Sequence, residues 1–189
     1  MAAVAATRGK LLVKNVTPKH LESITAKLRE MGVFVDEYDE AVLIDATGRN
    51  LKRCNLKTMP HPGFPTDCQP QFVALLTTVE GTSIVTENVW DNRYQYIREL
   101  LLMGAHISVE GRVAIIDGQL PLHGAPVKAT DLRAGAALII AGLVASGVTE
   151  ISSINYIERG YEEIIDKFRA LGADIRKQYV PDEDTAVTA

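Results

Sequence analysis

The chain has 189 residues, of which 47% are hydrophobic and 23% are charged, and its formal net charge is -4. This balance is typical of a globular protein with one domain or two very small ones, and it excludes disordered and strongly basic classes, so we expect no nucleic-acid partner. Cys54 and Cys68 are too few for a disulfide framework and lack metal-ligand spacing, so we expect two reduced thiols.

The first predicted elements lie in residues 2–16, where a short apolar helix leads through Gly9 to a strand-like run. The apolar stretch is too short for a signal peptide and no basic residue precedes it, so we expect a cytoplasmic protein. Residues 21–35 predict an amphipathic helix and then a strand, and a further strand, "EAVLIDA", starts at Glu40.

This order of elements recurs along the chain. Segments 72–89 and 137–154 repeat the plan of residues 2–16, and segments 94–108 and 161–175 repeat the plan of residues 21–35. The strand "RVAIID", from Arg112, completes the second copy. Three matching glycines are predicted to end the amphipathic helices in a left-handed conformation, and they are Gly32, Gly104 and Gly172.

The longest apolar stretch, residues 135–147, is shorter than the roughly 18 to 20 residues that span a bilayer. Because it is apolar on every side, we expect a buried helix and no membrane partner. The predicted fold class is therefore α/β, with a buried helix, a strand, an amphipathic helix and further strands used three times.

The two ends of the chain depart from this plan. The later buried helices start with a Thr-Asp pair, at residues 66–67 and 130–131, whereas the first copy begins inside its helix. We therefore expect a first repeat that is truncated. Residues 178–189 have no apolar period and predict a loose tail.

Asp67 allows two interpretations. Thr66 and Gln69 form a Thr-x-x-Gln capping box, and an acid in a first helical turn is stabilised by about 0.3 to 1 kcal/mol, so Asp67 can be explained as a helix cap. However, Pro62 and Pro65 make the preceding loop rigid, and a carboxylate held in one direction suits proton transfer or hydroxyl binding.

Three arginines are candidates for binding an anion. Arg93 and Arg159 occupy equivalent positions ahead of their amphipathic helices, and Arg133 follows Asp131 near the start of a buried helix. If the repeats surround a common axis, these guanidinium groups can converge on phosphate or carboxylate.

Other chemistry finds little support in the sequence. Cys68 has no histidine near it, so we interpret it as a small apolar side chain and not as a nucleophile. Scattered histidines and the lack of a glycine-rich phosphate loop lead us to expect no metal and no cofactor.

Several motifs, in order and spacing, resemble a known family: "HPGFPTDCQPQF", "VTENVWDNRY", "LLLMGAH", "VKATDLRAGAALIIAGLVASG" and "YIERGYEEIIDKFRALGADI". From residue 2 to residue 177 the chain resembles the C-terminal part of the enolpyruvyl transferases, specifically those that act on UDP-N-acetylglucosamine. The resemblance implies an inside-out α/β barrel of βαβαββ repeats, with buried helices and outer sheets, and one C-terminal domain over residues 1–177.

The resemblance also implies an activity and its residues. The enolpyruvyl group of phosphoenolpyruvate moves to the 3'-hydroxyl of UDP-N-acetylglucosamine, and phosphate is released, in peptidoglycan synthesis. Asp67 matches the aspartate that contacts that hydroxyl and accepts its proton. Asp131 matches a second candidate for proton transfer. The matching substrate-binding positions are Asp67, Val89, Arg93, Arg133 and Arg159. Arg159 lies on the phosphoenolpyruvate side and is, with Asp67 and Asp131, also a candidate catalytic residue.

The family also uses a second domain, which supplies a lysine-asparagine pair, further arginines and a loop with a reactive cysteine. None of these motifs occurs here, so the resemblance implies a chain that is inactive alone and needs that domain as a partner. Two alternatives stay open: 3-phosphoshikimate enolpyruvyl transfer, and a non-catalytic nucleotide-sugar-binding or interaction module.

Overall fold

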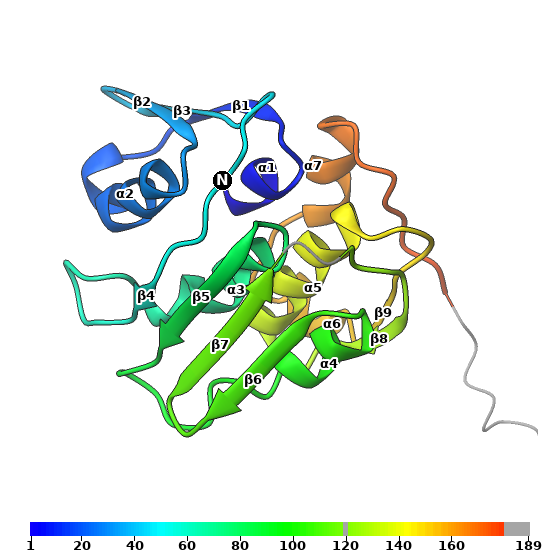
Figure 1. The fold of residues 1–189 in the computed structure, drawn as a ribbon. Helices are drawn as coiled ribbons and strands as arrows, with labels where there is room; N and C mark the ends of the chain where they lie inside the picture. Colours follow the sequence, from blue (N-terminus) through cyan, green and yellow to red (C-terminus); the bar gives the residue numbers. More distant parts are fainter. Residues whose placement is uncertain (119–120, 180–189) are drawn as a thin grey trace, which may run out of the picture.

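The computed structural model describes residues 1–118 and 121–179. It has an α/β architecture in which three sheets and their helices follow one another along the chain (Figure 1). In chain order the elements are α1 (Ala2–Ala6), β1 (Lys10–Lys14), η1 (Pro18–Leu21), α2 (Glu22–Glu30), β2 (Phe34–Tyr38), β3 (Ala41–Asp45), β4 (Leu56–Lys57), η2 (Thr66–Cys68), α3 (Gln69–Leu76), β5 (Gly81–Thr86), α4 (Ile97–Leu102), β6 (His106–Glu110), β7 (Val113–Gly118), β8 (Pro126–Lys128), α5 (Leu132–Val144), β9 (Glu150–Ser152), α6 (Asn155–Glu158) and α7 (Ile164–Ala170).

The predicted repetition is present as three units, which run from α1 to β3, from β4 to β7 and from β8 to α7. The first sheet has the order β1-β3-β2 and is antiparallel throughout. The second has the order β4-β5-β7-β6, with a parallel β4-β5 pair, and the third is the parallel pair β8-β9. The strands predicted from Glu40 and Arg112 are confirmed as β3 and β7. The three sheets stay separate, so the described residues form no closed barrel.

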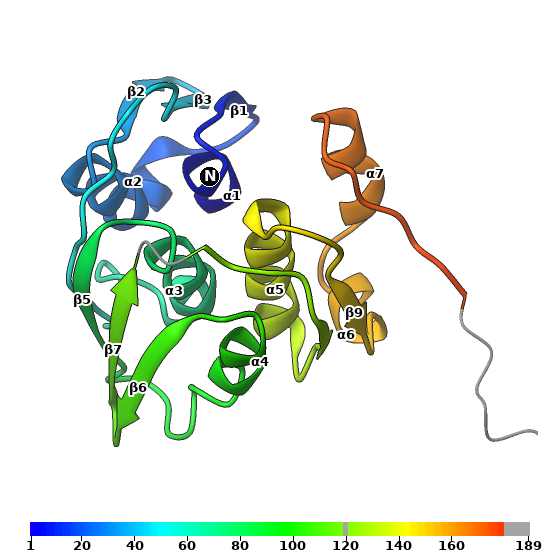
Figure 2. The same cartoon turned by 45° about the vertical axis from the view of Figure 1, so that its right-hand side comes forward.

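Helices α1, α3 and α5 contact one another at the centre, and the sheets lie around them (Figure 2). In α5 every residue from Ala134 to Ala141 is buried, and in α3 seven of the eight residues are buried. The all-round apolar sequence of α5 is explained by this position between the other helices and β9. Within the described ranges, no helix has the length and apolar character needed to cross a membrane.

The three predicted helix-ending glycines are confirmed. Gly32, Gly104 and Gly172 follow α2, α4 and α7 with φ between +84° and +95°. In each case the next residue donates its N–H to a carbonyl five residues back, as Val33 does to Leu28. This is the hydrogen bond of a Schellman cap, which the left-handed residue makes possible.

The third unit departs from the prediction. A strand was expected directly after Gly172, but residues 173–179 have no regular structure. A strand needs a neighbour to satisfy its N–H and C=O groups, and β9 pairs with β8 alone among the described strands. Of the predicted tail, residues 178–179 share this lack of regular structure, and residues 180–189 lie outside the described residues.

Candidate functional site

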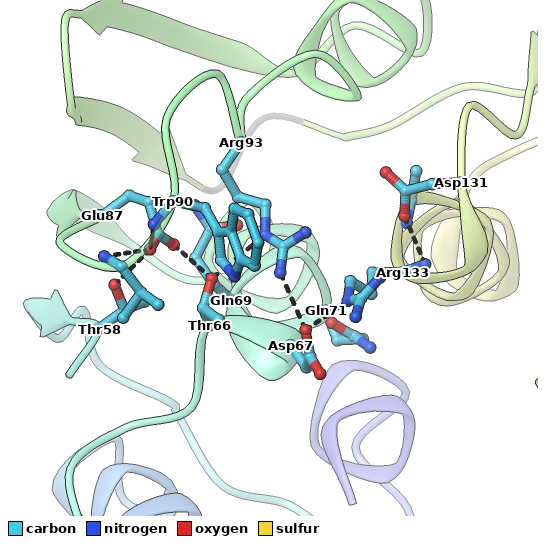
Figure 3. A network of polar contacts seen from close by, with 12 residues as sticks. Thr58, Thr66, Asp67, Gln69, Gln71, Glu87, Trp90, Arg93, Asp131 and Arg133 are labelled. Carbon is cyan, nitrogen blue, oxygen red and sulfur yellow. Dashed lines mark hydrogen bonds and ion pairs between the residues drawn. The ribbon is translucent and has the colours of Figure 1, made fainter. Parts of the chain in front are cut away.

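Asp67 lies between two guanidinium groups that come from different units (Figure 3). Its Oδ1 accepts a hydrogen bond from Nη2 of Arg93 at 2.9 Å and a second from Nε of Arg133. The Asp67 side chain is 58% exposed, compared with 14% for Arg93 and 31% for Arg133. Two guanidinium groups thus share one carboxylate at the surface, and Arg-type forks of this kind bind phosphate and carboxylate groups.

The capping-box interpretation of this segment is wrong. Neither Thr66 nor Gln69 makes the capping hydrogen bond, because each side chain has another partner. The Thr66 hydroxyl donates to Glu87 and accepts from Nε of Arg93, while Gln69 is fully buried and accepts from the Tyr96 hydroxyl. The helix begins with a 3-10 turn, η2, and Asp67 projects from that turn toward the arginines.

Asp131, in the matching position of the third unit, is the acid that caps a helix. Its Oδ1 accepts from the backbone N–H of Arg133 at 2.7 Å and of Ala134 at 3.0 Å, at the start of α5. Two N–H groups with no partner within the helix are thereby satisfied. The cap also fixes the backbone from which Arg133 reaches Asp67 (Figure 3).

The arginines change the acidity of Asp67. The hydrogen bond from Arg133 is the largest cause that holds the pKa of Asp67 below its usual value, and the charges of Arg133 and Arg93 act in the same direction. Partial burial opposes them. The same hydrogen bond raises the pKa of Arg133. Asp67 is therefore ionised at neutral pH, and its Oδ2 accepts no hydrogen bond from the described residues.

Sequence reasoning missed Glu87, which lies behind this cluster. Its side chain is 1% exposed, and it accepts hydrogen bonds from hydroxyl and backbone donors of three segments (Figure 3). One donor is the N–H of Val89, a predicted substrate-binding residue that is 38% exposed. The signal in the sequence was an acid that directly follows a strand, ahead of the loop that carries Arg93.

Arg159 lies apart from the Asp67 cluster in its contacts. It is the exposed C-cap of α6, ahead of α7, and its side chain has no hydrogen bond or ion pair within the described ranges. Its neighbour Gly160 packs against Leu132, at the start of the helix that carries Arg133. Tyr161 binds Gln71 at 3.1 Å, and burial raises the pKa of the tyrosine. The segment around Arg159 therefore lies against the buried helices α3 and α5.

A groove of about 560 Å³ runs beside the cluster, between α1, α5 and α7. Its lining is mainly apolar, and Cys68, Gln71 and Tyr161 form its edge toward Asp67. None of the charged residues Asp67, Arg93 and Arg133 lines this groove, so the charged cluster lies outside it and forms a rim that is open to the surface at Asp67, whose side chain is 58% exposed. Over residues 1–118 and 121–179, no three His, Cys, Asp or Glu side chains gather in a way that could hold a metal ion.

Comparisons with known proteins agree with one another. The family model of EPSP synthase (3-phosphoshikimate 1-carboxyvinyltransferase) matches residues 1–168. The UDP-N-acetylglucosamine 1-carboxyvinyltransferase 3 of Caldanaerobacter subterraneus subsp. tengcongensis is 55% identical over 93% of this chain and 42% of its own length. The UDP-N-acetylglucosamine 1-carboxyvinyltransferase of Desulfofundulus thermocisternus is 52% identical over 99% of this chain and 78% of its own length.

Solved structures show the same fold. The enolpyruvyl transferase NikO from Streptomyces tendae superposes with a TM-score of 0.83 at 28% identity, over 93% of this chain and 42% of its own. An EPSP synthase from Acinetobacter baumannii, at 18% identity, superposes with a TM-score of 0.68 over 94% of this chain and 43% of its own. The chain thus spans less than half the length of most of these relatives, and it belongs to the enolpyruvyl transferase family.

Proposed function

We propose that this chain is the C-terminal part, with residues 1–177 as its domain, of an enzyme that moves the enolpyruvyl group of phosphoenolpyruvate to the 3'-hydroxyl of UDP-N-acetylglucosamine and releases phosphate. The reaction would serve peptidoglycan synthesis in the cytoplasm. The observation that carries the proposal is the Asp67 carboxylate held between Arg93 and Arg133 at an open rim. Two relatives that share more than half of their aligned residues with the chain bear the name of this activity.

Asp67 takes the role of proton acceptor in this proposal. Its Oδ2 accepts no hydrogen bond from the described residues, and the side chain is 58% exposed, so a substrate hydroxyl can reach it. While both arginines bind the carboxylate, its pKa stays low and it is a weak base. An anionic substrate competes for the same guanidinium donors. As it draws them away, the basicity of Asp67 rises while the hydroxyl arrives.

The remaining predicted residues take roles around this centre. Arg93 and Arg133 bind the anionic groups of the substrates, and Arg159 adds a third guanidinium group on the phosphoenolpyruvate side. Val89 contacts the nucleotide sugar from the loop held by Glu87. Asp131 transfers a proton to or from the enolpyruvyl carbon through its Oδ2, because its Oδ1 is occupied by the helix cap.

The open rim supports a second domain as the partner of this chain. The chain spans 42% of the length of the Caldanaerobacter relative, and the rest of such a protein would cover the rim and exclude water. In the complete protein we expect the repeats to approach the inside-out barrel that the resemblance implies. Alone, the chain should bind substrates weakly and have no measurable turnover.

Reconstitution tests this function. The chain is assayed for phosphate release from phosphoenolpyruvate and UDP-N-acetylglucosamine, first alone and then mixed with the separately expressed remaining part of the Caldanaerobacter relative. We expect activity from the mixture and none from either part. If the mixture is inactive although the two parts bind each other, the chain is a non-catalytic binding module and the proposal fails.

Asp67→Asn in the active mixture tests the role of the carboxylate. Removing a general base typically lowers the rate by about 10²- to 10⁴-fold, so we expect kcat to fall within that range. Asp166→Asn is the matched control, because Asp166 is 77% exposed and makes one ion pair at 4.0 Å, within its own helix. Turnover of the Asp67 variant near that of the control would remove Asp67 from the chemistry.

The family model's own description favours a second candidate, transfer of the enolpyruvyl group to 3-phosphoshikimate. The same arginines would bind its phosphate, so the geometry of the rim does not separate the two acceptors. Competition does. The affinities of shikimate 3-phosphate and UDP-N-acetylglucosamine for the mixture are compared in a competition assay. If shikimate 3-phosphate binds more tightly, the acceptor assignment is reversed.

A further inference from the structure

Glu87 is a buried carboxylate just after β5, at the centre of a hydrogen-bond network (Figure 3). Burying a polar group that is 1% exposed is costly unless hydrogen-bond donors surround it. Oε1 accepts from the Thr58 hydroxyl and the Val89 N–H, each at 2.8 Å, and from the Trp90 N–H at 3.1 Å. Oε2 accepts from the Thr66 hydroxyl at 2.9 Å. All four donors are neutral groups, and within the described ranges the Glu87 carboxyl group makes no ion pair.

These donors belong to three segments that surround the candidate site. Thr58 directly follows β4, Thr66 opens the turn that carries Asp67, and Val89 and Trp90 start the loop that carries Arg93. Glu87 therefore joins the segments that carry three of the proposed substrate-contacting residues, Asp67, Val89 and Arg93.

The hydrogen-bond polarity of Thr66 depends on Glu87. The Thr66 hydroxyl donates its hydrogen to Oε2 of Glu87, so that hydrogen points away from Arg93. The lone pairs of that oxygen are then free for Arg93, whose guanidinium group only donates, and Nε lies 3.2 Å from it. With Nε held in this way, Nη2 of Arg93 reaches Asp67 at 2.9 Å.

We propose that Glu87 is a positioning residue of the site: its buried carboxylate fixes the Thr66 hydroxyl as an acceptor for Arg93 and thereby holds the Arg93 guanidinium group against Asp67. The link from this arrangement to substrate binding rests on the proposed function. The hydrogen bonds from Glu87 through Thr66 to Arg93 are independent of that function.

Glu87→Gln tests this polarity with almost no change in shape. An amide offers one accepting oxygen, which the Thr58, Val89 and Trp90 donors occupy. Its NH₂ group then faces Thr66 and takes one lone pair of the hydroxyl oxygen, while the hydroxyl hydrogen loses its acceptor and must turn elsewhere, so the orientation in which the oxygen receives Arg93 is lost. Thr66→Val removes the connecting hydroxyl altogether, whereas Thr66→Ser keeps it.

The first measurement is the exchange rate of the Arg93 Nε–H with water, from ¹⁵N NMR of the chain itself. Loss of one hydrogen bond to a charged group should speed exchange by about tenfold or more, and we expect this for Glu87→Gln and Thr66→Val but not for Thr66→Ser. Tyr94→Phe is the matched control for stability. It removes a buried hydroxyl that donates to Val85 at 2.8 Å, outside the path to Arg93, and should leave the rate unchanged.

The second measurement uses the reconstituted enzyme. Glu87→Gln should raise KM for phosphoenolpyruvate by about tenfold, by the same loss of one charged hydrogen bond, and lower kcat by less. If the unaltered mixture has no activity, the proposed function fails while the NMR result still decides the role of Glu87.

Two results would overturn the inference. One is an Arg93 exchange rate in Glu87→Gln that equals that of the unaltered chain. The other is equal acceleration by Tyr94→Phe, which would mean that any loosening near β5 frees Arg93. If Glu87→Gln fails to fold, the Thr66 pair decides, because Glu87 reaches Arg93 through that hydroxyl. Slow exchange in Thr66→Val would then refute the path.

Discussion

Replacing Gly135 with alanine tests the packing of α6 against α5, the contact that sets where Arg159 lies. A β-carbon at Gly135 would be 2.3 Å from Cγ1 and 2.8 Å from Cδ1 of Ile157. Carbon atoms in contact normally lie about 3.5 to 4.0 Å apart, so Ile157 must move by roughly 1 Å or more. Because Ile157 is 3% exposed and packs in a small core with Ile139 and Ile164, it has little room to do so.

Two opposing terms set the expected magnitude. Inserting a methyl group into a packed core costs about 1 to 3 kcal/mol, whereas alanine is about 1 kcal/mol better than glycine within a helix. We therefore expect Gly135→Ala to lower the free energy of unfolding by about 1 kcal/mol, within a range of roughly 0 to 2. The displacement falls on α6, whose C-cap is Arg159, so the variant should also disturb that guanidinium group.

Gly142→Ala is the matched control in the same helix. Its β-carbon would meet Thr149 at 3.3 Å, a contact that a shift of a few tenths of an ångström relieves. The propensity term should then dominate, making this variant neutral or more stable by up to about 1 kcal/mol. Urea unfolding of both variants with equal m-values measures the difference. A Gly135 variant at least as stable as the Gly142 variant would refute the described packing of α6 on α5.

Three further predictions concern the charges and thiols of the fold. Arg133→Ala removes the largest cause of the low pKa of Asp67, so that pKa should rise toward its usual value in a carboxyl NMR titration, and more than in Arg93→Ala. In the unaltered chain the ionised Asp67 carboxylate stabilises the folded state at every pH above its unfolded pKa of about 4. This stabilisation is lost as the pH falls through the lower pKa that Asp67 has in the folded state. Arg133→Ala should therefore reduce the loss of stability in acid, and an unchanged acid profile would contradict the coupling. Arg8 donates to the Ala5 carbonyl at 2.8 Å and to the Thr78 carbonyl at 2.9 Å, and so links the ends of α1 and α3. Arg8→Ala should therefore lower the free energy of unfolding by about 1 to 3 kcal/mol. A decrease of less than a few tenths of a kcal/mol in urea unfolding would refute this link. Burial raises the pKa of Cys54 to about 11, so iodoacetamide should alkylate it at neutral pH only after denaturation, and rapid labelling of the native chain would contradict its burial.

The sequence by itself determined the repetition and the elements that carry it. Apolar spacing distinguished buried from amphipathic helices, and glycines at matched positions marked helix ends, because both depend on neighbours within one turn of the chain. That is why α5 and the three Schellman caps were predictable. The strand expected after Gly172 was not formed, because a strand depends on a partner that its own residues do not specify.

The tertiary structure decided what each acid does. Thr66-Asp67 and Thr130-Asp131 are the same pair in sequence, yet Asp131 caps its helix while Asp67 binds two arginines. Local propensity favours a cap at both positions. The difference arises because Arg93, 26 residues away, reaches Asp67 when the second unit folds, and Arg133, 66 residues away, reaches it only once the second and third units pack together. The sequence marked these arginines as candidates for an anion site, but which carboxylate they bind depends on contacts between residues far apart in the chain, so only the tertiary structure could decide it.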